Sequence, residues 1–271
     1  MQNQKARCQA LLNSRFASEV EIFGFPGELP SLHIAGPLPL AAELPYGRDA
    51  HCKRLQQLQR PNELHALLAS AAECRQLPPS LNVYTADFAT VCALREQGHK
   101  PPIVSACAVL VCADKREIML HRRSAESATA PNTLHTIGGA YLPPSPGEPG
   151  DSGLEDTILR EIHEETGLAL QARALPPLMC SQELATGFIQ FTFLGLAVPA
   201  AELEQLRGSW EGKVVSVGYD DLHETLAAPG WVASGKAQVL AWLALGAPGI
   251  HAGQQFGALS PAQLFDTLHP L

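Results

Sequence analysis

The sequence predicts an α/β protein on three observations. Residues 103–112 form a continuous apolar run, which is typical of a strand covered on both of its faces. Residues 187–197 send apolar side chains to two faces in turn, as a second strand would. Residues 153–168 instead repeat apolar side chains every four positions, which predicts a helix.

The other elements follow in chain order from similar patterns. Pro, Gly and Leu are frequent in residues 1–45, where a short strand is predicted at 20–25. Further strands are predicted at 117–123, 133–141, 174–181 and 213–217. Further helices are predicted at 49–75 with a break near Pro61, and at 84–97, 200–207, 219–226 and 236–245.

These patterns divide the chain into three parts. We predict an N-terminal accessory α+β domain over residues 1–100, a main domain over 101–248 and a C-terminal tail over 249–271. The N-terminal part carries no motif that assigns a role. It is either a structural cap, or it supplies substrate specificity or the interface of a homodimer.

Carboxylates crowd one side of the helix predicted at 153–168. Glu161, Glu164 and Glu165 stand at positions i, i+3 and i+4, a spacing at which like charges repel. A hard divalent cation such as Mg²⁺ or Mn²⁺ would offset that repulsion, because it takes oxygen ligands. Arg160 lies beside the cluster and has a planar group suited to holding one carboxylate in place. The alternative interpretation is an ordinary solvated helix face.

The string from Arg160 to Leu168, Arg-Glu-Ile-His-Glu-Glu-Thr-Gly-Leu, resembles the second half of the signature of the Nudix hydrolases. Gly138-Gly139 is similar to the glycine pair of that family, and residues 120–124 are similar to the strand end that precedes its motif. The resemblance implies that residues 101–248 form a Nudix hydrolase domain. Its fold would be an α/β/α sandwich with a mixed β-sheet.

The first half of the signature departs from the family pattern. Counting back from the Arg-Glu pair puts Ser152 where the family has Glu, and Pro146 where it has Gly. Gly139 stands thirteen residues before Ser152 rather than six, so the loop is longer. The segment Glu148-Pro149-Gly150-Asp151 is similar to the family's Glu-x-Gly-Glu, one residue out of register. Asp151 or Ser152 could therefore take the place of the first glutamate.

The resemblance also implies a reaction, the Mg²⁺- or Mn²⁺-dependent hydrolysis of a nucleoside diphosphate linked to another group. In that reaction metal cations neutralise the phosphates and activate a water molecule. Carried over by position, Glu161, Glu164 and Glu165 would be metal ligands, one of them acting as base. Gly139 would offer its carbonyl oxygen, and Arg160 would orient Glu161.

Three further residues are candidates for contact with substrate. Arg122 and Arg123 could meet a phosphate group, although a structural salt bridge is an equal alternative. Glu183 lies near a strand end where the family recruits another acid, although a solvated role is also open. The layout is similar to Nudix enzymes of nucleotide sugars, while ADP-ribose, dinucleotides and coenzyme A derivatives stay open.

Composition excludes several other classes. The net charge of −8 and pI near 5.7 argue against a nucleic-acid partner. Seven scattered cysteines without a Cys-x-x-Cys pair predict reduced thiols, and hence a cytoplasmic location. The N-terminus lacks the apolar core of a signal peptide, and the run at 103–113 is too short to cross a membrane.

Two rival functions keep the same fold. A catalytically weak Nudix module would bind a nucleotide or a partner protein as a regulator, and the degenerate first half of the signature favours it. A Nudix-like isomerase of isoprenoid diphosphates would need an acid–base pair that the sequence does not reveal.

The sequence Gly150-Asp151-Ser152-Gly153 is similar to a serine-protease segment, but the helix that follows it disfavours that class. His163 has no second histidine at the zinc spacing.

Overall fold

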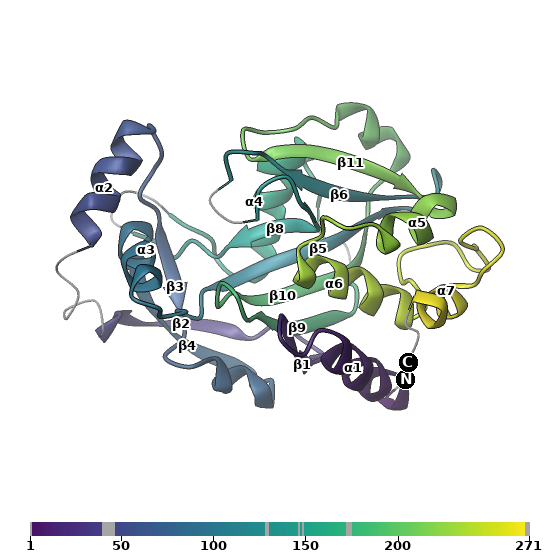
Figure 1. Cartoon of the computed structure of the whole chain (residues 1–271), viewed down its shortest axis with the longest axis horizontal. Coiled ribbons are helices and arrows are strands. Elements are labelled where there is room, and N and C mark those ends of the chain that lie inside the picture. Colours follow the sequence, from purple (N-terminus) through teal and green to yellow (C-terminus); the bar gives the residue numbers. More distant parts are fainter. Residues whose placement is uncertain are drawn as a thin grey trace.

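The computed structural model describes residues 2–39, 47–127, 130–145, 147, 149–171 and 175–268. It confirms the α/β class, with a mixed eight-stranded sheet between helices and a small three-stranded sheet beside it (Figure 1). Pro146 and Glu148, two positions of the expected signature, lie outside the described residues. Among the helices that the structure describes, none has the length and apolar character to cross a bilayer.

The large sheet has the strand order β1-β9-β10-β5-β6-β11, with β7 beside β6 and β8 beside β5. Only β5 and β10 pair in parallel among these neighbours; the other pairs are antiparallel. The strands are β1 (Val20–Gly24), β5 (Val104–Cys112), β6 (Glu117–Arg123), β7 (Leu134–His135), β8 (Ile137–Ala140), β9 (Leu178–Glu183), β10 (Ile189–Ala197) and β11 (Gly212–Gly218).

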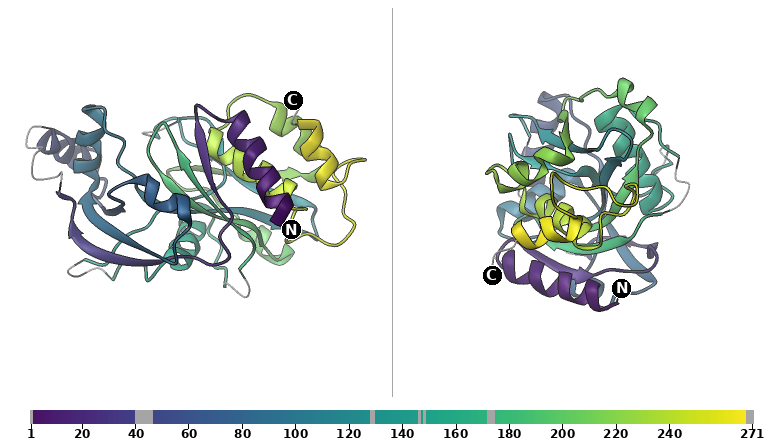
Figure 2. Two further views of the ribbon diagram at one scale, coloured as in Figure 1. Left: turned by 90° about the horizontal axis from the view of Figure 1, so that it is seen from below. Right: turned by 90° about the vertical axis from the view of Figure 1, so that its right-hand side faces the viewer.

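Strand β5 is central and buried along its whole length, as its continuous apolar run predicts. Its residues Val109 and Val111 face a core shared with α1 (Gln2–Arg15), α6 (Ala233–Ala244) and α7 (Pro261–Leu268). Its residues Ala106 and Leu110 face a second core on the other side, which includes α4 (Leu154–Thr166). Figure 2 shows α1, α6 and α7 gathered on one side of the sheet.

A small lobe lies beside the large sheet and is formed by residues 31–96, of which 40–46 lie outside the described residues (left in Figure 1). We call it the N-terminal lobe. Its sheet has the order β2-β4-β3, with β2 and β4 parallel. Its elements are β2 (Ser31–Pro37), α2 (Arg48–Gln57), β3 (Leu64–Leu67), the 3₁₀-helix η2 (Ala71–Gln76), β4 (Ser80–Asp87) and α3 (Phe88–Glu96).

Two of the predicted helices were wrong in the N-terminal lobe. The helix expected at 49–75 ends with α2, and Leu64–Leu67 is a strand. The helix expected at 84–97 begins only at Phe88, because the preceding residues continue β4 until the Asp87 side chain accepts a hydrogen bond from the Thr90 N–H and caps α3. Leucine spacing alone could not reveal these strands, since their partners are distant in the sequence.

Helix α1 was also missed, because residues 1–45 have weak periodicity and only a short strand was predicted there, whereas most other helices lie in the ranges predicted as helical. The 3₁₀-helices η3 (Ala200–Gln205) and η4 (Tyr219–Asp221) and the α-helix α5 (Leu222–Ala227) lie in the ranges predicted as helical. The tail, which carried no predicted element, contains α7, whose Leu264 and Phe265 are buried in the α1/α6 core. The predicted domain limits stay a prediction. We note that β1 pairs with β9 within the large sheet, ahead of the N-terminal lobe.

Candidate active site

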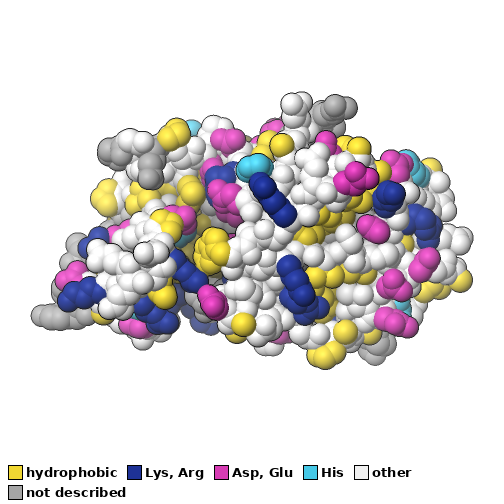
Figure 3. Space-filling view, turned by 90° about the horizontal axis from the view of Figure 1, so that it is seen from above, with side chains coloured by type: hydrophobic (Ala, Val, Ile, Leu, Met, Phe, Trp, Pro, Cys, Tyr) yellow, Lys and Arg dark blue, Asp and Glu magenta, His cyan; other side chains and the backbone are white. Residues whose placement is uncertain are grey.

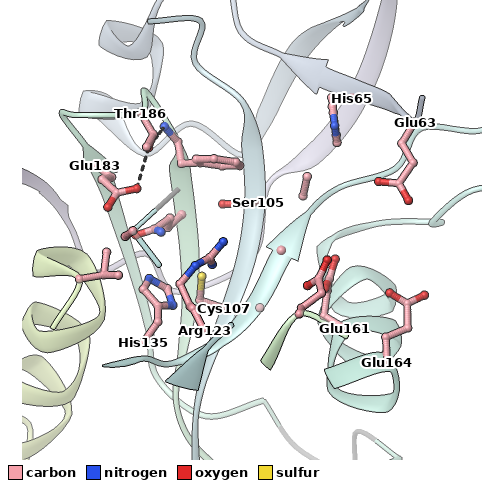
Figure 4. Close-up of a pocket in the computed structure, with 18 of the residues that line it drawn as sticks. Glu63, His65, Ser105, Cys107, Arg123, His135, Glu161, Glu164, Glu183 and Thr186 are labelled. Atoms are coloured by element: carbon pink, nitrogen blue, oxygen red, sulfur yellow. Dashed lines mark hydrogen bonds between the residues drawn. The ribbon is translucent and has the colours of Figure 1, made fainter. Parts of the chain in front are cut away.

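A cleft of about 440 Å³ lies between the second half of α4, the strand β8 and the N-terminal lobe (Figure 4). Helix α4 delivers the carboxylates to it. The buried residues Leu154, Ile158 and Ile162 fix the inner face of the helix, and Gly167 ends it with a φ of 78°, a conformation that favours glycine. This placement turns Glu161 and Glu164 towards the cleft.

Arg160 ties this end of the cleft together. Its guanidinium donates to Glu161 at 2.8 Å, to Glu164 at 3.0 Å, to both oxygens of Asp151 at 2.8 and 3.0 Å, and to the carbonyl oxygen of Ala140 at 2.8 Å. Burial by itself would lower the pKa of Arg160, but hydrogen bonding and attraction from Asp151 and Glu161 outweigh it and raise that pKa. The guanidinium is therefore permanently charged and fixed in direction.

Glu161 is 8 % exposed, and its charge is only partly compensated. Burial raises the pKa of Glu161 well above its ordinary value; Arg160 opposes this rise, whereas Glu165 and Glu164 add to it. Gly139 lies against this carboxylate, since a Cβ atom at Gly139 would come within 2.3 Å of Glu161 Oε1. Because Gly139 has no side chain, it leaves room for the Glu161 carboxylate.

Glu165 is 3 % exposed and is held by two donors. His121 Nδ1 lies 2.9 Å from Glu165 Oε1, and the Gly138 N–H donates to Glu165 Oε2 at 3.1 Å. Gly138 needs to be glycine at this point, because its φ is +149° and a Cβ atom would lie 2.3 Å from the Ala106 carbonyl oxygen. The glycine pair thus packs against both buried glutamates.

The two candidates for the missing first glutamate differ in what they contact. Asp151 is 4 % exposed, accepts twice from Arg160 and also accepts from the Leu142 N–H at 3.0 Å. Ser152 is exposed, and its N–H donates to Asp156 at the start of α4. Of these two residues, Asp151 is therefore the one that contacts Arg160.

The structure separates the three residues predicted to contact substrate. Arg123 lines the cleft. Arg122 donates instead to the Asn132 carbonyl oxygen at 3.3 Å and does not line this cleft. Glu183 lies on the wall away from α4, where it accepts from Thr186 at 2.6 Å and from Ser234 at 3.4 Å (Figure 4).

Two acidic residues that the sequence did not single out also face this cleft. Glu211 follows an exposed tryptophan in the turn before β11, and Glu63 precedes β3 in the N-terminal lobe. Burial raises the pKa of Glu211, and the nearby charge of Glu165 raises it further, against the effect of Arg123. Neither residue belongs to a motif, so only the folded chain could reveal them.

The donor chemistry at this end of the cleft fits a hard divalent cation. Glu161, Glu164 and Glu165 offer carboxylate oxygens, and two of them, Glu161 and Glu165, are buried. Among the residues that the structure describes, no three His, Cys, Asp or Glu side chains are already arranged as a metal site. Arg160 and His121 hold the three glutamates in their present positions.

Comparison with models of known protein families assigns most of the predicted main domain to one family. The model of the NUDIX domain matches residues 101–243. A search of curated protein sequences gives no match. The chain belongs to the Nudix hydrolase family, as its signature predicted.

Solved structures give weaker likenesses. A MutT protein from Methanosarcina mazei Go1 is 24% identical over 52% of this chain and 92% of its own, with a TM-score of 0.40. A bifunctional NMN adenylyltransferase/ADP ribose pyrophosphatase from Francisella tularensis is 14% identical over 56% of this chain and 45% of its own, with a TM-score of 0.45. The NUDIX domain of Shewanella oneidensis NrtR is 14% identical over 54% and 88%, with a TM-score of 0.38.

Proposed function

We propose that this protein is a divalent-metal-dependent pyrophosphohydrolase that cleaves a nucleoside diphosphate linked to another group. The observation that carries the proposal is that Glu161 and Glu164 line one end of the cleft, with Glu165 close to Glu161 and Gly139 packed against the Glu161 carboxylate. Two of these glutamates are buried, and buried carboxylates are rarely retained without a cation or a catalytic role.

The protein's own contribution to the reaction is to position charges. Glu161, Glu164 and Glu165 would hold the Mg²⁺ or Mn²⁺, which when bound supplies charge neutralisation and a more acidic water. Arg160 orients Glu161 and Glu164 through its hydrogen bonds, and Asp151 orients Arg160 in turn. His121 and the Gly138 N–H fix Glu165.

The substrate would lie along the cleft from these carboxylates. Arg123 lines the cleft and can attract phosphate oxygens. Glu183 stands on the far wall, where it could accept a hydrogen bond from a hydroxyl group of the substrate. Nucleotide sugars and ADP-ribose-like compounds both combine a diphosphate with such hydroxyl groups, so both classes belong in a substrate panel.

A regulatory binding module is the second candidate, and one observation favours it. Arg160 already pairs with Glu161 and Glu164, and His121 pairs with Glu165, so each glutamate of the set has a cationic or hydrogen-bonding partner without a metal. Such a site could bind a nucleotide without cleaving it. Turnover distinguishes the two functions.

The test is phosphate release after phosphatase treatment, with nucleoside diphosphate sugars, ADP-ribose, NADH and coenzyme A as substrates, in Mg²⁺, Mn²⁺ or chelator. We expect metal-dependent turnover of at least one compound and its loss in the double variant Glu164→Gln/Glu165→Gln. The matched control is Glu155→Gln, an exposed residue of the same helix. Absence of turnover in a folded protein that binds nucleotide would support the regulatory function instead.

A further inference from the structure

The cleft continues beneath the N-terminal lobe into a second space of about 230 Å³. We call this space the aromatic compartment, because Phe88, Phe188 and Trp210 line it together with Leu55 and Pro61. It shares Glu63, His65, Arg123, Phe188 and Glu211 with the cleft described above. Ligand pockets usually measure about 300–1,000 Å³, so the compartment suits one part of a ligand rather than a whole one.

The N-terminal lobe is docked firmly enough to form a wall. Leu67 forms a β-bridge with Ile103, and the Leu68 N–H donates to the Pro102 carbonyl oxygen at 2.9 Å. Phe188 packs in a small core that also contains Leu94 of the lobe. The space-filling view shows hydrophobic, acidic and basic side chains gathered where the lobe meets the larger body (Figure 3).

Two polar side chains on this wall lack partners for some of their nitrogen atoms. His65 is 7 % exposed, and its Nδ1 has no hydrogen-bond partner among the described residues. Nor does Arg95 Nε have one, although Arg95 also donates to the Thr186 carbonyl oxygen at 3.0 Å and lies 5.3 Å from the centre of the Phe188 ring. Buried polar atoms without partners are uncommon, and each calls for an explanation such as a bound water, ion or ligand.

The opposite wall of the cleft differs in this respect. Glu183 accepts from Thr186 and Ser234, and Gln190 accepts from Gln238 at 3.0 Å. These side chains are hydrogen-bonded to other side chains of the protein, so fewer of their donors and acceptors are left for a ligand. The unused hydrogen-bonding capacity lies on the wall that the N-terminal lobe supplies.

The chemistry of the compartment selects a planar ring. Aromatic and aliphatic side chains enclose it, and flat rings stack well on such surfaces. Charged side chains of both signs also line it, and Arg60 lies 4.5 Å from the centre of the Trp210 ring, so the aromatic surfaces rather than a charge of one sign favour a flat ring. Burial, followed by the charges of Arg95 and Arg160, lowers the pKa of His65 to about 4, so at neutral pH His65 is uncharged and offers one donor and one acceptor.

We propose that the N-terminal lobe is the specificity element of the enzyme. Its Phe88, His65 and Arg95, with Trp210 opposite, take a heteroaromatic ring that carries hydrogen-bond acceptors. This inference deepens the proposed function, on which it rests for the statement that the ring is attached to the cleaved diphosphate. A ring-free, hydroxyl-rich group would gain little from these walls.

The first test is equilibrium binding in chelator, which needs no turnover. Tryptophan fluorescence is titrated with adenosine, guanosine and uridine monophosphates, and with ribose 5-phosphate as the ring-free probe. We expect saturable quenching by at least one ringed probe, with affinity about tenfold or more above that of ribose 5-phosphate. Trp210 is 62% exposed, so Trp210→Ala should fold, and its affinity for the ringed probe, measured by calorimetry because the fluorescent side chain is gone, should fall to that for ribose 5-phosphate.

The matched variants are two arginines of the same lobe. Arg95→Gln should weaken binding of the ringed probe about tenfold and leave binding of ribose 5-phosphate unchanged. Arg75 pairs with Glu21 on the exposed surface, so Arg75→Gln should change neither. If Arg95→Gln does not fold, the Trp210→Ala comparison decides the matter alone. Equal binding of ringed and ring-free probes would overturn the inference.

Kinetics separate this inference from the function on which it rests. For a diphosphate that is turned over, Arg95→Gln and Trp210→Ala should raise KM and leave kcat within about threefold. Turnover without any ring preference would refute the specificity role and leave the hydrolase standing. Ring binding that these variants abolish, in a protein that hydrolyses nothing, would refute the hydrolase and leave the ring compartment standing.

Discussion

The two ends of the cleft are built on opposite principles. At the α4 end, Arg160 and His121 are hydrogen-bonded to the carboxylates, so charge is concentrated and held in fixed directions. At the lobe end, His65 and Arg95 keep nitrogen atoms without partners among the described residues, as His121 Nε2 does at the α4 end, but here aromatic side chains line the walls. The first end suits a reaction common to many diphosphates, whereas the second suits a choice among them. Changes at the α4 end should therefore affect all substrates alike.

The largest effect should come from Glu161→Gln. This change removes a buried carboxylate from the proposed metal site, and loss of a mere supporting residue already costs about 10–100-fold in metal affinity or activity. We expect more than about 100-fold loss of kcat/KM for every substrate that is turned over. Glu155→Gln is the control, and steady-state kinetics are the measurement. A loss of kcat/KM confined to one substrate would contradict the assignment of the reaction to the α4 end and of substrate choice to the lobe end.

A similar loss should follow from Gly139→Ala, with little effect on folding. The added methyl group would meet the end of the Glu161 side chain, which can turn away, rather than rigid backbone. We expect activity to fall about 10–100-fold while the thermal midpoint changes little. Thermal denaturation and Mn²⁺ titration give the two readouts. A variant that unfolds but keeps its specific activity would contradict this account.

The role of Asp151 in holding Arg160 predicts a smaller effect. Asp151→Asn should weaken the orientation of Arg160 and lower kcat about 10-fold or more, because neighbours of metal ligands contribute on this scale. Ser152→Ala removes a hydroxyl group at the other candidate position and should leave kcat unchanged. Equal losses in both variants would mean that the loop as a whole, rather than the carboxylate, matters.

The smallest effect concerns stability and its dependence on pH in chelator. The pKa of Glu161 is raised in the folded state, first by burial, so the folded protein holds that proton to a higher pH than the unfolded chain does. Stability should therefore fall as pH rises above the unfolded value of about 4.3 and towards the folded one. Glu161→Gln should flatten this slope and raise the thermal midpoint at neutral pH, by about 2–4 °C for each kcal/mol.

The control for the pH effect is again Glu155→Gln, which should keep the slope because Glu155 is exposed. Thermal melts at several pH values, each with and without Mn²⁺, measure both. Added cation should remove most of the slope by occupying the same carboxylates. An unchanged slope in Glu161→Gln would show that another group is responsible.

The α4 end was predictable from sequence because its chemistry is local. Glu161, Glu164, Glu165 and Arg160 lie within two turns of one helix, so the spacing of the residues places their side chains together. The apolar run of β5 likewise identified a strand buried on both faces. For the first glutamate of the signature, the sequence left two candidates, Asp151 and Ser152. Of the two, Asp151 is the one whose side chain contacts Arg160, and this contact could be found only in the folded chain.

The lobe end could not be predicted in the same way. His65 lies on β3, a strand expected to be helical, and it reaches the cleft only because β3 pairs with β4 and the lobe docks on Ile103. Arg95, Glu63 and Glu211 come from three separate segments. Strand pairing and docking of this kind depend on contacts between residues that are distant in the chain, for which local patterns carry no signal.

The most direct test of the central claim is Mn²⁺ binding, followed by electron paramagnetic resonance. The account predicts at least one Mn²⁺ bound to the wild-type chain and to Glu155→Gln. It predicts that binding is about 100-fold weaker or lost in the triple variant Glu161→Gln/Glu164→Gln/Glu165→Gln, with the fold checked by circular dichroism. Equal Mn²⁺ binding by the wild type and by the folded triple variant would contradict the account.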